Sequence, residues 1–182
     1  MAFAISLLFD TRTADAVEEQ WERLADAGIS RSMIDLDFPP HVTLAVYDKL
    51  RGDAAIAVLD GAFIRLNTMR VELTAISTFE AGSGVLYVAL AQSADLVKLH
   101  AIIEAAIGET CRPHYQAGSW TPHCTLATGV SDNGLARAKD LLAATWQPLT
   151  GVFEAAAFVE FAPVVQIKRW ELDPAPRSTR RP

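Results

Sequence analysis

The sequence predicts an α+β protein of two lobes, in which antiparallel sheets carry helices on their outer faces and enclose a central cleft. Three observations support this prediction. The stretch FPPHVTLA, residues 38–45, recurs as WTPHCTLA, residues 120–127, nearly half of the 182-residue chain later. Strand and helix patterns alternate in a similar order around the two copies. Two units are too few for a repeat array, so we expect one duplicated domain over residues 1–174, with lobes that are either sequential or intertwined.

The first half of the chain shows clear boundaries between elements. The apolar run at residues 2–9 is typical of a buried strand. Thr13 is the expected N-cap of the next helix, which Gly28 ends. Two prolines exclude helix just before His41, so HVTLAVY is expected to be a strand. The other elements predicted here are a helix over residues 52–59 and strands over 63–66 and 71–79.

The second half repeats this alternation. The sequence GSG, residues 82–84, predicts a turn that pairs the strand 71–79 with a strand over 85–91. Ser93 is expected to cap a helix that ends at Gly108. A polar loop then leads into the second motif. The later predicted elements are a strand over 123–129, a helix capped by Ser131 or Asp132 and stopped by Pro148, and strands over 153–161 and 164–172.

Composition limits the class of protein. Hydrophobic residues make up 51% of the chain, enough for a sizeable core. No uncharged apolar run reaches the roughly 18 residues of a membrane span, and the N-terminus lacks the basic region of a signal peptide. Two cysteines make no disulfide framework, so we expect a cytoplasmic protein. Residues 175–182 are polar, basic and proline-rich and are expected to form a flexible tail.

The charge balance limits the partners. The formal net charge is −6, and an acidic surface repels a long polyanion. We therefore expect a small nucleotide or an RNA terminus as the substrate, and neither long nucleic acid nor membrane as a partner. A monomer is favoured, although the sequence leaves the oligomeric state open.

The two motifs place histidine and threonine on one side of each strand. Because side chains alternate with period two, His41, Thr43, Ala45 and Tyr47 should share a face, and His123 should share one with Thr125. The intervening apolar residues should pack against helices. If the lobes lie side by side, the two polar faces meet across the cleft.

Two imidazoles and two hydroxyls around one cavity suit phosphoester chemistry. A neutral imidazole can take a proton and an imidazolium can give one, and both forms exist near neutral pH. Threonine hydroxyls can donate to the non-bridging phosphate oxygens, where charge develops in the transition state. Neither a metal nor a cofactor is required, and neither motif contains a carboxylate. The sequence does not say which histidine acts as base and which as acid.

Paired H-x-T motifs in this order, each preceded by proline and followed by leucine, resemble the two-histidine (2H) phosphoesterase superfamily. The nearest branch comprises 2′-5′ RNA ligase-like proteins and RNA 2′,3′-cyclic phosphodiesterases. The resemblance implies a bilobal fold and metal-independent attack on a 2′,3′-cyclic or related phosphodiester. By motif, the catalytic histidines are His41 and His123, with Thr43 and Thr125 as substrate ligands.

The chain departs from this family at one position. Members often carry a basic residue shortly after the second motif, where this sequence has Thr128. Positive charge for the phosphate is then expected from Arg112, His114 or Lys168. The expected substrate-binding residues outside the motifs are Tyr47, Arg112, His114 and Tyr115.

Several residues have competing interpretations. Tyr47 could stack on a base or simply pack, and His114 could contact substrate or lie in a solvated loop. Structural roles are favoured for His100, for the aromatic residues Phe38 and Trp120, and for Cys124 as a buried apolar residue. A nucleotide- or RNA-end-binding module with little turnover remains the main alternative, and a metal-dependent hydrolase a weaker one.

Overall fold

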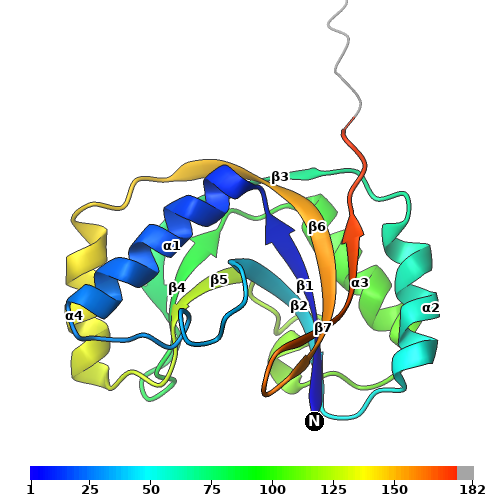
Figure 1. The fold of residues 1–182 in the computed structure, drawn as a ribbon, viewed down its shortest axis with the longest axis horizontal. Helices are drawn as coiled ribbons and strands as arrows, with labels where there is room; N and C mark the ends of the chain where they lie inside the picture. The colour runs from blue at the N-terminus through cyan, green and yellow to red at the C-terminus, as the bar shows by residue number, and fades with distance from the viewer. Residues whose placement is uncertain (176–182) are drawn as a thin grey trace, which may run out of the picture.

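The computed structural model describes residues 1–175. In this part of the chain, seven strands form one antiparallel sheet in the order β1-β2-β5-β4-β3-β6-β7, and β1 also pairs with β6 (Figure 1). The strands are β1 (Ala2–Phe9), β2 (His41–Tyr47), β3 (Met69–Thr78), β4 (Leu86–Leu90), β5 (His123–Ala127), β6 (Leu149–Phe161) and β7 (Val165–Glu171). The helices are α1 (Thr11–Asp26), α2 (Gly52–Phe63), α3 (Ala94–Ile107) and α4 (Asp132–Ala143), with a 3₁₀ turn, η1, at Pro113–Tyr115. The predicted α+β class with outer helices is confirmed.

The long strand β6 connects the two sides of the sheet. Its first residues, 149–153, pair with β3, and residues 153–161 pair with β1. Helices α1 and α4 lie on one side of the molecule in Figure 1, and α2 and α3 lie on the other. Helix α1 contacts β5, whereas α3 contacts β2. Each motif strand is therefore covered by a helix from the other half of the chain.

Helix α1 begins two residues before the predicted cap. Asp10 is the N-cap: its carboxylate accepts hydrogen bonds from the backbone N–H and the hydroxyl of Thr13, at 3.0 and 2.8 Å. The assignment of Thr13 as the cap was wrong, because the aspartate three residues earlier supplies the stronger acceptor. Its inner face, with Val17, Trp21 and Leu24 at helical spacing, is buried.

Helix α2 is longer than expected and takes in Phe63, and a turn follows it where a strand was predicted over residues 63–66. Its buried residues, Ala55, Leu59 and Phe63, lie at four-residue intervals, so the helical period continues to Phe63. The Phe63 ring packs against Trp170, with ring centroids 5.2 Å apart. The short strand was wrong because this anchor belongs to the helix.

The other predicted elements are present with small shifts at their ends. Ser93 caps α3 by accepting from the N–H of Leu96, and Gly108 follows the helix with φ +71°, a conformation that glycine adopts readily. Ser131 rather than Asp132 caps α4. The pair β3–β4 is an antiparallel hairpin as expected, and β6 and β7 also pair antiparallel.

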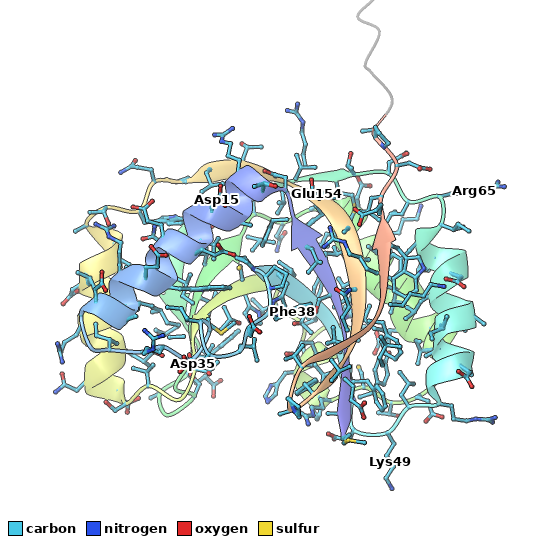
Figure 2. All side chains as sticks on the ribbon, in the orientation of Figure 1. Asp15, Asp35, Phe38, Lys49, Arg65 and Glu154 are labelled. Carbon is cyan, nitrogen blue, oxygen red and sulfur yellow. The ribbon has the colours of Figure 1, made fainter. Side chains whose placement is uncertain are left out.

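Two apolar clusters fill the molecule. The larger one lies between the sheet and the helices. The smaller one is rich in alanine and lies on the sheet face shared with His41 and Thr43; its buried members are Ala4, Leu8, Phe38, Val46, Ala155, Ala157 and Val159. Figure 2 shows Phe38 near the middle of the molecule, whereas Lys49 and Arg65 project from its outer edge.

Other expectations concern the termini and the cysteines. Apart from Ala175, the tail predicted at 175–182 lies outside the described residues. None of the helices in residues 1–175 has the length and apolar character needed to cross a bilayer. Cys111 and Cys124 are both buried and unpaired with one another.

Candidate active site

The two H-x-T motifs lie on neighbouring antiparallel strands. Val42 of β2 pairs with Cys124 of β5, and both side chains are buried. The histidine and threonine of each motif flank this pair and are half-buried. Because side chains alternate along a strand, these four polar groups share the opposite face of the sheet. The structure thus brings together His41, Thr43, His123 and Thr125.

Each motif threonine has its backbone carbonyl bound by a tryptophan from the other half of the chain. Trp120 Nε1 donates to the carbonyl oxygen of Thr43 at 2.9 Å, and Trp21 Nε1 donates to that of Thr125 at 3.1 Å. A single residue pair joins β2 to β5. Backbone carbonyls next to that pair therefore need hydrogen-bond donors from outside the two strands. The two indoles supply such partners and hold the motif strands in place.

The imidazole rings of His41 and His123 are held by the same kind of hydrogen bond. His41 Nδ1 lies 2.8 Å from the carbonyl oxygen of Pro39, and His123 Nδ1 lies 2.7 Å from that of Thr121. A carbonyl oxygen only accepts hydrogen bonds, so Nδ1 carries the hydrogen in each ring. The neutral form then has a free lone pair on Nε2. Each ring is fixed at one nitrogen and available for proton transfer at the other.

Aromatic side chains support both imidazoles. The edge of Phe38 meets the ring of His41 at 5.1 Å between centroids. Phe79 and Tyr87 meet His123 in the same manner, at 4.9 and 5.2 Å. Sequence analysis did not identify Phe79 or Tyr87 as site residues. Their proximity to His123 depends on the β4–β5 register, in which Tyr87 pairs with Thr125, and a single sequence does not contain this register.

Burial lowers the pKa of both histidines. For His41 the largest cause is loss of solvent; the bond to the Pro39 carbonyl opposes it, and the charge of His123 lowers the pKa further. For His123 burial again lowers the pKa, and the bond to Thr121 opposes it. Burial thus disfavours the imidazolium form of both rings. A bound phosphate anion would reverse this preference because it stabilises the positive charge.

A cavity of about 640 Å³ adjoins the second motif. It is lined by the turn between β3 and β4 (79–85), by the loop 112–121 and by β5 with the residues that follow it. This volume falls within the range of small-ligand sites. Of the predicted site residues, this cavity is lined by Arg112, His114, Tyr115, His123 and Thr125. His41 and Thr43 are not part of this lining and reach the site from the neighbouring strand.

Arg112 brings positive charge to the cavity wall. Its Nε and Nη2 atoms donate to Asp48 Oδ1 at 2.9 and 2.6 Å, and its guanidinium lies 5.8 Å from the ring centre of Phe161. Hydrogen bonding from Arg112 lowers the pKa of Asp48. Lys168, another predicted source of charge, instead pairs with Asp60 at 2.6 Å and does not line the cavity. The expectation for Lys168 was wrong, because β7 lies at the far edge of the sheet from β5.

Tyr47 does not face the site. The register of β1 with β2 shifts between Ile5 and Ser6, so that Ser6 pairs with Thr43 and Ile5 with Ala45. One extra residue on β2 reverses the alternation beyond it. Tyr47 is consequently 0% exposed in the main core. The predicted substrate contact for Tyr47 was wrong, because alternation was extended through a bulge.

The bulge leaves Ser6 on the motif face. Ser6 is 1% exposed, and its hydroxyl lies 3.5 Å from that of Thr43. This contact helps to orient the Thr43 hydroxyl. Sequence analysis did not find Ser6, because its apolar strand carries no motif.

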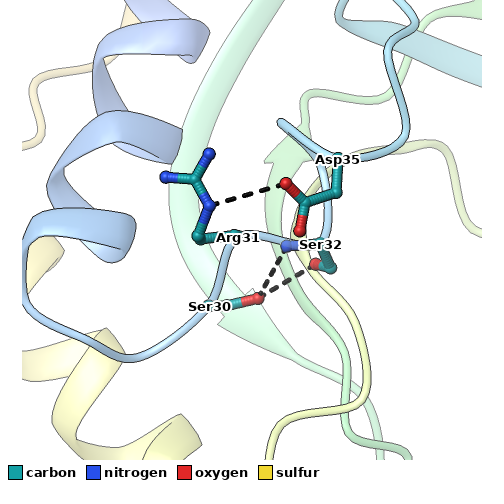
Figure 3. Close-up of polar contacts among 4 residues, drawn as sticks. All are labelled: Ser30, Arg31, Ser32 and Asp35. Atoms are coloured by element: carbon teal, nitrogen blue, oxygen red, sulfur yellow. Dashed lines mark hydrogen bonds and ion pairs between the residues drawn. The ribbon is translucent and has the colours of Figure 1, made fainter.

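The loop before the first motif is tied to the end of the second. Ser30 accepts a hydrogen bond from the N–H of Ser32 at 3.2 Å, and Arg31 pairs with Asp35 at 3.5 Å (Figure 3). Ser32 Oγ in turn accepts from the N–H of Thr128 at 2.9 Å. Thr128, the residue that sequence analysis singled out after the second motif, lines the cavity. This cross-link holds the two motif regions together.

A smaller hollow of about 380 Å³ lies next to α1. Trp21 and Phe38 contribute apolar walls, and Glu18, Glu22 and Asp37 contribute carboxylates. Three carboxylates repel a phosphate, so this hollow is unsuited to the chemistry of the motifs. Within residues 1–175, no three His, Cys, Asp or Glu side chains are grouped as metal ligands.

Solved structures share this architecture. The crystal structure of E. coli LigT complexed with 3′-AMP matches with a TM-score of 0.65 and 17% identity, covering 93% of this chain and 97% of that one. TT0787 of Thermus thermophilus matches with a TM-score of 0.65 and 16% identity, covering 96% and 100%. Kluyveromyces marxianus Usb1 matches with a TM-score of 0.51 and 12% identity, covering 91% and 97%. At these identities the likeness shows the fold.

Sequence comparison shows the family. No curated protein sequence matches this chain. The family model described as the 2′-5′ RNA ligase superfamily matches residues 13–163, a span that includes both H-x-T strands, the cavity loop and all four helices except the first two residues of α1. With two histidines set on adjacent strands in the manner that the motif predicts, the chain belongs to the 2′-5′ RNA ligase superfamily of 2H phosphoesterases.

Proposed function

We propose that the protein is a metal-independent phosphodiesterase that opens a 2′,3′-cyclic phosphate, or a related phosphodiester, on a nucleotide or RNA end. The observation that carries the proposal is the matched orientation of His41 and His123. Each ring donates from Nδ1 to a backbone carbonyl two residues earlier, which leaves Nε2 for the reaction.

The proposed reaction divides two proton transfers between the rings. One neutral imidazole takes a proton from water as its oxygen attacks phosphorus. The other, as imidazolium, gives a proton to the ribose oxygen whose bond to phosphorus breaks. The product carries a phosphomonoester and a free hydroxyl. The two roles exchange in the reverse reaction, so each histidine serves as acid or base according to direction.

The threonines and the cavity wall hold the phosphate in this proposal. The hydroxyls of Thr43 and Thr125 donate to its non-bridging oxygens, Arg112 supplies positive charge, and His114 offers a further hydrogen-bonding group at the cavity wall. Tyr115 lies beside them and is suited to contact the sugar or base. Charge-assisted hydrogen bonds of this kind are stronger than neutral ones, so they compensate for the absence of a basic residue at Thr128.

The ligands found in crystal structures of structural relatives support a substrate of nucleotide size. E. coli LigT has been crystallised with 3′-AMP, with ATP and with phosphate. A cavity of about 640 Å³ in this chain has room for a ligand of that class.

Turnover of nucleoside 2′,3′-cyclic phosphates by the wild type, His41→Ala and His123→Ala tests the proposal. We expect each substitution to lower kcat by roughly 10²–10⁴-fold, the usual contribution of general acid–base catalysis. Thermal unfolding of each variant establishes that the fold is intact, and ³¹P NMR identifies the monoester formed. An unchanged rate in either folded variant would remove that histidine from the mechanism. Full activity after exhaustive chelation is expected, and loss of activity would favour a metal-dependent hydrolase.

The second candidate is a nucleotide- or RNA-end-binding module with little turnover. It is favoured by the formal net charge of −6 and by Thr128 at the usual basic position. Calorimetry with nucleoside monophosphates and cyclic phosphates separates the two functions. Tight binding without product supports the module, whereas rapid conversion excludes it.

A further inference from the structure

His100 is a buried histidine outside the proposed chemistry. It lies on α3 with 4% of its surface exposed. Its Nε2 lies 2.7 Å from the carbonyl oxygen of Tyr115. Because a carbonyl only accepts, His100 donates this bond, and it does so to the loop that forms one wall of the cavity.

The ring of His100 makes a second contact, with the other side of the site. It stacks on Trp120, with ring centroids 4.2 Å apart and planes inclined by 5°. Trp120 in turn donates to the backbone carbonyl of Thr43. One side chain is therefore linked both to the cavity loop and, through an indole, to the first motif strand.

The cavity loop depends on contacts of this kind for its shape. Between α3 and β5, regular structure is limited to the three-residue turn η1. Glu104, one helical turn after His100, accepts from the N–H of Ala117 at 3.1 and 3.3 Å. The N–H of Arg112 donates to the carbonyl of Val46 at 2.8 Å. Helix α3 thus anchors the middle of the segment that presents Arg112.

The geometry points to His100 as a positioning residue that holds the two sides of the site in register. Through Tyr115 it places the cavity loop with its positive charge, and through Trp120 it places Thr43. This inference rests on the proposed function and adds a residue that does not itself touch the substrate.

Substitutions that remove one contact at a time separate the two roles. His100→Phe keeps a flat ring against Trp120 but loses the bond to Tyr115, so the loop loosens. We expect KM for a nucleoside 2′,3′-cyclic phosphate to rise about fivefold, the equivalent of one neutral hydrogen bond, with kcat changed less. His100→Gln retains a donor of similar reach and should restore KM. Trp120→Phe loses the bond to Thr43 and should lower kcat about fivefold.

Trp146→Phe is the matched control. Trp146 Nε1 donates to the carbonyl of Thr74 at 2.7 Å, so its substitution removes an equivalent indole bond away from the cavity. We expect this variant to lose thermal stability and to keep kcat and KM. Thermal unfolding ranks the stability of all four variants.

Affinity for inorganic phosphate, measured by calorimetry, gives a readout independent of turnover. His100→Phe should weaken it by about the same fivefold, and His100→Gln should restore it. If the wild type binds phosphate but converts no cyclic phosphate, the proposed reaction fails. The inference about His100 is then decided by the phosphate affinities of the His100 variants alone. The inference would be overturned if His100→Phe had the same kinetics and phosphate affinity as Trp146→Phe. It would also be overturned if the wild type bound no phosphate.

Discussion

Val42 of β2 and Cys124 of β5 form the single residue pair that joins the two motif strands. Both residues are buried, and the histidine and threonine of each motif stand on either side of them. The pair therefore fixes the register of β2 against β5, and with it the position of one imidazole relative to the other. Its role is to pack, since the burial that surrounds Cys124 raises the pKa of its thiol to about 12.

Cys124→Ala tests this assignment. A thiol with so high a pKa is not a nucleophile near neutral pH, so we expect kcat to stay within about twofold of the wild type. The lost packing should lower the free energy of unfolding by about 1 kcal/mol. Steady-state kinetics and chemical denaturation measure the two effects, with Cys111→Ala as a second buried cysteine for comparison. Loss of turnover in a folded Cys124→Ala protein would implicate the thiol in the reaction.

Trp21 is the counterpart of Trp120 in the second motif. Trp21→Phe removes the donor to the carbonyl of Thr125 while keeping most of the apolar volume. We expect kcat to fall about fivefold, because β5 loses a constraint on the position of Thr125. Trp146→Phe again serves as the control for a lost indole bond. Equal kinetics in the two variants would show that the indole at Trp21 only stabilises the fold.

Much of the architecture was predictable because local chemistry determines it. Turn glycines, serine caps and apolar periodicity placed α3, α4 and the β3–β4 hairpin. The duplicated motif identified the four polar residues that meet across β2 and β5. These features depend on residues close together in the chain.

The failures share a different cause. Tyr47 was placed on the wrong face because a bulge in the β1–β2 pairing reverses the alternation, and a bulge is a property of two strands together. Ser6, Phe79 and Tyr87 were missed because only the sheet register brings them to the motifs. The structural role expected for His100 agrees with its burial, but the identity of its partners, Tyr115 and Trp120, depends on a loop with little regular structure, which a single sequence does not specify.

The lowered pKa values of His41 and His123 predict the pH dependence of kcat/KM. This parameter reports the free enzyme, in which burial moves both pKa values below the ordinary 6.5. As pH rises above these values the required acid is lost, and as pH falls below them the required base is lost. We therefore expect a bell whose maximum lies on the acid side of about pH 6.5.

Bound phosphate should move these titrations the other way. The anion stabilises each imidazolium, so it raises both pKa values, and by linkage phosphate binds more tightly as pH falls toward them. NMR titration of the two imidazoles with and without phosphate measures the shift. Catalysis by paired imidazoles would be contradicted if kcat/KM did not change with pH. It would also be contradicted if phosphate left the pKa values of the two histidines unchanged.

Arg112→Ala should weaken substrate binding more than it slows the chemistry. Hydrogen bonds to charged groups contribute about 1.5–3 kcal/mol, so we expect KM to rise at least tenfold. Arg31→Ala is the matched control, because Arg31 also pairs with an aspartate but lies outside the cavity lining. The wild-type KM should rise with ionic strength, and that of Arg112→Ala should respond less. Equal salt dependence in both proteins would place the phosphate away from Arg112.

Thr128→Arg introduces a cation where related proteins often carry one. The backbone N–H of Thr128 already bonds to Ser32, so the substitution changes only a side chain that faces the cavity. A second cation should tighten the binding of inorganic phosphate about tenfold, and Thr128→Gln, of similar length without charge, should not. Calorimetry at low ionic strength measures both, and thermal unfolding checks that the fold accommodates the longer side chains. If the arginine variant binds phosphate no better than the glutamine variant, the anion lies beyond reach of residue 128. The charge of Arg112 would then determine where phosphate binds in the cavity.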